Sequence, residues 1–77
     1  MLVQYVRDKN GNPVGCVVAT SCNMVGWSML RKGDTFNKDM AKRIASGRAV
    51  VGTQAVPPSR IVGIIENMNS RSIKYFK

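Results

Sequence analysis

The chain has 77 residues, which is enough for one small domain spanning residues 1–77. It carries 12 Lys and Arg against 4 Asp and Glu, a net charge of +8, and it contains no histidine. The missing histidine removes the commonest general base and the commonest metal ligand. The four carboxylates are scattered without metal-type spacing. We therefore expect a binding protein rather than an enzyme, with no metal and no cofactor, and an anionic partner.

Cysteine content and hydropathy bear on the compartment. Cys16 and Cys22 cannot complete a tetrahedral zinc site without two further ligands, so we expect two buried or half-buried thiols, with a disulfide as the minor alternative. No apolar run approaches the ~20 residues needed to cross a bilayer, and the N-terminus lacks the layout of a signal peptide. We expect a cytoplasmic protein without a membrane partner. The small core leaves homo-oligomerisation open.

The first thirty residues predict an antiparallel meander. Residues 2–7 and 14–20 are rich in β-formers, and Asn10-Gly11 between them is a strong hairpin signal because both residues tolerate positive φ. Pro13 cannot donate to a ladder and should begin the second strand. Residues 24–30 read as a third strand, in which Gly26 indicates a bulge or the close approach of another backbone.

Two helices are predicted after the strands. Asn37 is a favoured N-cap and Gly47 is a natural residue to close the first helix. Residues 60–77 repeat apolar side chains at helical spacing, including Tyr75 and Phe76, although residues 61–65 alone would also suit a strand. The predicted fold is α+β, a three-stranded antiparallel β-meander followed by two helices packed on one face of the sheet (βββαα).

Five segments carry a family resemblance. They are VRDKNGNPVG at 6–15, GWS at 26–28, KGDTFNK at 32–38, IASGRA at 44–49 and RSIKYFK at 71–77. Together they resemble a group of small basic proteins encoded by bacteriophages and prophages. The resemblance implies a phage origin, with the host cytoplasm as the compartment. It implies no mechanism, because no activity is established for the group.

Basic residues are the first candidate site. Clustered cations can replace the counterions condensed on a phosphate backbone, which gives affinity with little sequence dependence. The alternatives are a solvated face that keeps the protein soluble, or a surface that meets an acidic protein. The candidate nucleic-acid-binding residues gather around the first helix and at the end of the second: Arg31, Lys32, Lys38, Lys42, Arg43, Arg48, Arg71 and Lys74.

Aromatic residues on the sheet are the second candidate. Tyr5 and Trp27 could stack bases, as aromatics do on the exposed sheets of several RNA- and single-strand-binding modules. A small core also needs large side chains, so a core position is favoured for Trp27, while the two readings balance for Tyr5. The basic hairpin tip at 9–12 could enter a groove, but a plain turn explains it as well.

The sequence favours a small phage-encoded nucleic-acid-binding protein, with DNA the favoured polymer, acting through a basic helix face. One alternative is a host-takeover or anti-defence inhibitor that binds an acidic bacterial protein. A further alternative is a minor structural or oligomeric phage protein.

Overall fold

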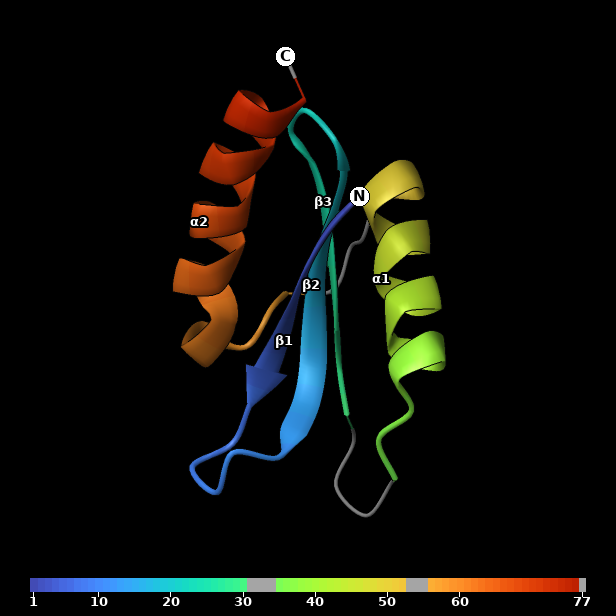
Figure 1. Ribbon diagram of the computed structural model, residues 1–77, viewed down its shortest axis with the longest axis vertical. Helices are drawn as coiled ribbons and strands as arrows, with labels where there is room; N and C mark the ends of the chain where they lie inside the picture. The colour runs from blue at the N-terminus through green and yellow to red at the C-terminus, as the bar shows by residue number, and fades with distance from the viewer. Residues whose placement is uncertain (31–34, 53–55, 77) are drawn as a thin grey trace.

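A computed structural model describes residues 1–30, 35–52 and 56–76 (Figure 1). Strands β1 (Leu2–Arg7), β2 (Pro13–Ser21) and β3 (Met24–Met29) form one antiparallel sheet in the order β1-β2-β3. Helices α1 (Lys38–Val51) and α2 (Ser59–Tyr75) follow, so the predicted α+β fold with the order βββαα is confirmed. Neither helix, in the part of the chain that the structure describes, has the length and hydrophobicity needed to cross a bilayer.

The turn between β1 and β2 is the predicted hairpin. Gly11 has a φ of 85°, a conformation that costs glycine little. The Asp8 carboxylate accepts hydrogen bonds from the backbone N–H groups of Asn10 and Asn12, both at 2.9 Å. β2 then begins at Pro13, where a missing N–H does least harm to the ladder.

The two helices cover opposite faces of the sheet (Figure 1). Val17 and Ala19 of β2 pack in a cluster with residues of α2, whereas Cys16 and Val18 pack in a cluster with residues of α1. The prediction that both helices pack on one face is therefore wrong. The physical reason lies in β2, whose successive apolar side chains point to alternate faces, so that each face needs its own cover.

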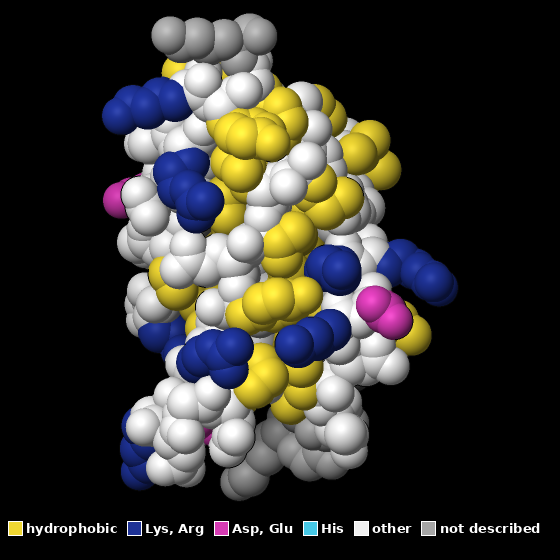
Figure 2. All heavy atoms as spheres, in the orientation of Figure 1, with side chains coloured by type: hydrophobic (Ala, Val, Ile, Leu, Met, Phe, Trp, Pro, Cys, Tyr) yellow, Lys and Arg dark blue, Asp and Glu magenta, His cyan; other side chains and the backbone are white. Residues whose placement is uncertain are grey.

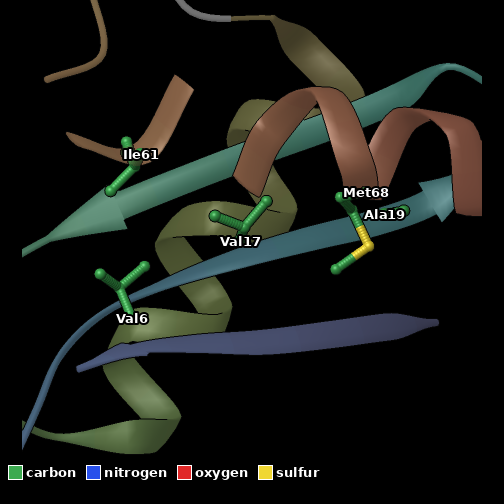
Figure 3. Packing of buried hydrophobic residues seen from close by; sticks show 5 residues of the cluster. All are labelled: Val6, Val17, Ala19, Ile61 and Met68. Carbon is green, nitrogen blue, oxygen red and sulfur yellow. The ribbon is translucent and has the colours of Figure 1, made fainter. Parts of the chain in front are cut away.

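The α2 face is filled by large side chains. Ile61 and Met68 point from α2 toward Val17 and Ala19 of the central strand, and Val6 of β1 completes the cluster (Figure 3). All five residues are buried. Trp27 of β3 packs against this cluster and is half-buried.

The α1 face is built from small residues. Ala41, Ala45 and Ala49 recur every four positions and form the buried stripe of α1. A Cβ at Gly26 of β3 would overlap the carbonyl oxygen of Ala45 and the backbone nitrogen of Ala49. The predicted close approach of another backbone at Gly26 is therefore confirmed. Close by, the Ser28 hydroxyl donates a hydrogen bond of 3.0 Å to the Ala41 carbonyl.

The end of α1 differs from the prediction. Gly47 does not close the helix, which continues to Val51. The cap is Gly52, with a φ of 91° and an N–H that donates to the Arg48 carbonyl at 2.7 Å. The extra turn buries Ala49 against Gly26, a tertiary contact that outweighs the local preference of Gly47 to end a helix.

Both cysteines are free thiols. Cys16 is buried under α1, as predicted, but Cys22 is exposed in the turn between β2 and β3, so the prediction of a buried or half-buried thiol is wrong there. The turn itself is held to α2, because the Asn23 N–H donates a hydrogen bond of 3.1 Å to the Ser72 hydroxyl.

Candidate nucleic-acid interface

The edge strand β1 lies beside α1 rather than beneath it. α1 packs mainly on β2 and β3. Val3 and Tyr5, the β1 side chains that join the α1-side cluster, are consequently only partly buried. This leaves a margin of sheet open next to the helix, where side chains of α1 and β1 meet.

On this margin, a lysine side chain lies over the ring of Tyr5. The Lys38 ammonium lies 5.4 Å from the centroid of the Tyr5 ring, within the range of a cation–π contact. Phe36 meets the same ring edge-on, with centroids 6.2 Å apart and planes at 83°. Phe36 and Lys38 flank the N-cap Asn37, whose side chain accepts from the Met40 N–H at 3.0 Å. The start of the helix thus fixes the position of Lys38.

Lys42 lies one helical turn beyond Lys38. Burial raises the pKa of the Cys16 thiol to about 11, and the nearby positive charge of Lys42 opposes this rise. Cys16 is the partner of Tyr5 in the β1–β2 register. Lys38 and Lys42 therefore both line the α1 side of β1.

Cations of α2 line the other side of β1. The Arg71 guanidinium donates a hydrogen bond of 3.3 Å to the Gln4 side-chain oxygen. A hollow of about 350 Å³ lies beside it, lined by Leu2, Arg71, Lys74 and Tyr75. α2 thus places two cations and an exposed aromatic ring next to the beginning of β1.

These residues lie on the two sides of β1, and we call them together the β1 strip. Its members come from three elements: Tyr5, Lys38, Lys42, Arg71, Lys74 and Tyr75. Figure 2 shows the side on which β1 lies nearest the viewer: hydrophobic side chains form a band along the molecule, with Lys and Arg side chains on both sides of it. Even if every acidic residue paired with a basic one, a charge of +8 would remain on the chain.

The other predicted basic residues lie elsewhere. Arg43 is exposed on α1, about 100° around the helix from Lys42 and away from the buried alanine stripe. Arg48 reaches the opposite edge of the sheet, where its guanidinium donates a hydrogen bond of 2.8 Å to the Trp27 carbonyl of β3. Arg31 and Lys32 lie outside the described residues.

The two predicted stacking residues have different surroundings. Tyr5 belongs to the β1 strip, although Lys38 already lies over its ring. Trp27 packs against the core on the α2 side, and the Arg48 guanidinium lies 5.0 Å from its ring centroid. Trp27 therefore offers less ring surface to a ligand than its residue type suggests.

The sequence predicts Tyr75 on the apolar face of the second helix. In the structure 64% of it is exposed, and it lines the hollow with Arg71 and Lys74. The signal was available, because residues three and four positions apart share a helix face and Arg71, Lys74 and Tyr75 have that spacing. An aromatic ring that shares a face with two cations is more typical of a surface than of a core.

The β1 strip contains lysine, arginine and tyrosine side chains. It supplies positive charge, N–H donors and aromatic surface. No group of three or more His, Cys, Asp or Glu that could hold a metal ion occurs among residues 1–30, 35–52 and 56–76.

No family model, curated protein or solved structure matches the chain. The choice of function therefore depends on the geometry and charge of the β1 strip.

Proposed function

We propose that this protein is a nucleic-acid-binding protein of phage origin, with DNA the favoured polymer, and that the β1 strip contacts the phosphate backbone. One observation carries the proposal: Lys38 and Lys42 of α1, with Arg71 and Lys74 of α2, flank a single edge strand. Cations arranged along a line suit a linear polyanion, because each can release a condensed counterion from it.

The strip extends the expectation of a basic helix face. Two of its cations come from α1, and two come from a helix on the other face of the sheet. β1 has six residues and is about 20 Å long, so the strip matches a short length of backbone rather than a single phosphate. We propose binding without catalysis, because the chain has no histidine and only four acidic residues.

A salt titration tests the proposal. Fluorescence anisotropy of labelled oligonucleotides would give the association constant at several salt concentrations. With four phosphate contacts, we expect a slope of about −3 to −4 for log K against log salt concentration. The absence of binding to any oligonucleotide at low salt would overturn the proposal.

A matched pair of variants tests whether the β1 strip is the surface that contacts the phosphates. Lys42→Gln and Arg43→Gln each remove one charge from adjacent positions of the same helix, but only Lys42 belongs to the β1 strip. We expect Lys42→Gln to reduce the magnitude of the slope by about 0.7 to 0.9 and Arg43→Gln to leave it nearly unchanged. Equal effects would show that binding follows the overall charge and not the strip.

A second candidate function is the binding of an acidic bacterial protein. A groove of about 500 Å³ runs between the end of β3 and α1, and its wall includes Met40, Ile44 and Arg48. Met40 is 51% exposed and Ile44 is 40% exposed, an apolar surface that phosphate binding does not use. An acidic segment would find apolar contact and the Arg48 charge together.

Capture from nuclease-treated host lysate tests this candidate. A stoichiometric acidic partner should be captured by the native protein and by Lys42→Gln, but not by Met40→Glu. Capture that needs intact nucleic acid, or that survives Met40→Glu, would refute a protein partner in this groove.

A further inference from the structure

The hollow at the end of α2 combines an exposed ring with two cations. Tyr75 is 64% exposed, and Arg71 and Lys74 line the same hollow of about 350 Å³. Tyr75 also meets Phe76 in a T-shaped contact, with centroids 4.9 Å apart and planes at 82°. Because Phe76 packs against the core, this contact holds the Tyr75 ring in place while most of it stays in solvent.

Arg71 is available to an anion. Its only described hydrogen bond, to Gln4, is long at 3.3 Å and exposed to solvent. Exchanging that bond for a charge-assisted one to a phosphate oxygen would strengthen the interaction, because a guanidinium matches phosphate in a planar, two-pronged geometry. The hollow can thus hold a phosphate next to an aromatic ring.

We infer that this hollow is a nucleotide subsite and that the polymer bound along the β1 strip is single-stranded. The inference rests on the proposed function. A base stacks on the Tyr75 ring, and the adjoining phosphate lies between Arg71 and Lys74. A duplex would leave the ring unused, because its base faces are hidden in the stack, whereas the bases of a single strand can lie on aromatic side chains.

The path of the bound nucleic acid follows from the position of β1. Leu2 lines the hollow, and Tyr5 lies three residues further along the strand, about 10 Å away. A single strand leaving the hollow along β1 reaches Lys38 and Lys42 next. Tyr5 contributes less stacking than Tyr75, since it is half-buried with Lys38 over its ring.

Three labelled ligands at one low salt concentration test the inference: an oligothymidylate, the same strand paired with oligoadenylate, and an abasic strand of equal length. We expect the oligothymidylate to bind about 5- to 150-fold more tightly than the abasic strand, the equivalent of one base stack. We also expect it to bind more tightly than the duplex. These comparisons use the native protein and need no variant to fold.

Variants then assign the difference to one ring. Tyr75→Ala should remove most of the advantage of oligothymidylate over the abasic strand, while Tyr75→Phe should keep it. Ile73→Ala, at a half-exposed position of the same helix, is the matched control and should change neither affinity. Thermal melts of each variant would establish that it is folded.

The outcomes separate the two proposals. Equal binding of single strand and duplex, or of oligothymidylate and the abasic strand, would overturn the single-strand subsite and leave the nucleic-acid function standing. A loss in Tyr75→Ala that is equal for both strands would do the same, because it would show a structural role for the ring. If none of the three ligands binds, both proposals fail.

Discussion

The two faces of the sheet are covered in different ways. On the α1 face, backbone approaches backbone at Gly26, because the glycine and the alanine stripe place only small side chains between β3 and the helix. On the α2 face, contact is made through large side chains such as Ile61 and Met68. Helix-packing distances depend on the side chains at the contact, so small residues permit the closer approach.

The close packing of α1 on β3 determines where an open surface can form. This packing fixes the position of the helix, which therefore lies toward the β3 edge of the sheet. β1 is left at the margin, with Tyr5 and Lys38 beside it. A packing detail in the core thus determines which edge of the sheet is open to a ligand.

The largest test of the comparison is Gly26→Ala. Even one methyl group would overlap the backbone of α1, which can yield only by moving the helix, so we expect a loss of about 4 kcal/mol or more in the free energy of unfolding. Urea denaturation would measure it. The control Gly47→Ala, where nothing lies within 4 Å of the added methyl, should stabilise the protein by about 0.5 to 1 kcal/mol. Similar changes in the free energy of unfolding for the two variants would refute the close packing of α1 on β3.

Met68→Ala examines the α2 face, where a cavity replaces a large buried side chain. We expect a loss of about 3 kcal/mol, because the neighbours can collapse only in part around the missing atoms. The exposed Val62→Ala on the same helix should change stability by less than about 0.5 kcal/mol. If both substitutions lower the free energy of unfolding by the same small amount, the α2 face is not a packed core.

Cys16 gives the α1 face a pH dependence. Burial raises the pKa of its thiol from 9.0 to about 11, so the folded state holds the proton more tightly than the unfolded state. The stabilisation is complete below pH 9 and is lost as the pH rises toward 11, with a limit of about 3 kcal/mol. Denaturation from pH 8 to pH 11 should show a steeper decline in the native protein than in Cys16→Ala. Identical slopes would contradict a desolvated thiol under α1.

The smallest expected effect concerns the start of α1. Asn37→Ala removes the side-chain acceptor of the Met40 N–H, and we expect a loss of about 1 kcal/mol. Asn67→Ala, at an exposed position within α2, serves as the matched control. Because the cap also fixes Lys38 beside Tyr5, Asn37→Ala should weaken oligonucleotide binding slightly, whereas Asn67→Ala should not.

The strands and their hairpin were predictable because their signals are local. Asn10-Gly11 and Pro13 act within a few residues, and the structure uses both as expected. The placement of the helices was predicted wrongly, although its signal was present. Residues 14–19 form an unbroken apolar run, and such a run indicates a strand that is buried on both faces.

The grouping of the candidate site could not be read from the sequence. Charge periodicity shows that Lys38 and Lys42 share a helix face, but not that β1 lies beside them. Whether those lysines flank the same strand as Arg71 and Lys74 depends on which edge of the sheet α1 leaves open. That edge is determined by the contact of α1 with Gly26. Arg48 belongs to the same helix as Lys38 and Lys42, but its side chain contacts β3 and not β1.

The hydrogen bond from Arg48 has a consequence for crowding. β3 is an edge strand with an apolar sequence, and such strands can recruit copies of themselves into extended aggregates. Under the proposed function, copies bound to one polymer would meet at high local concentration. The Arg48 guanidinium donates to the Trp27 carbonyl at this edge, so a neighbour's N–H would have to share that carbonyl with a bulky side chain. We therefore expect Arg48 to oppose the pairing of β3 with the same strand of a second copy.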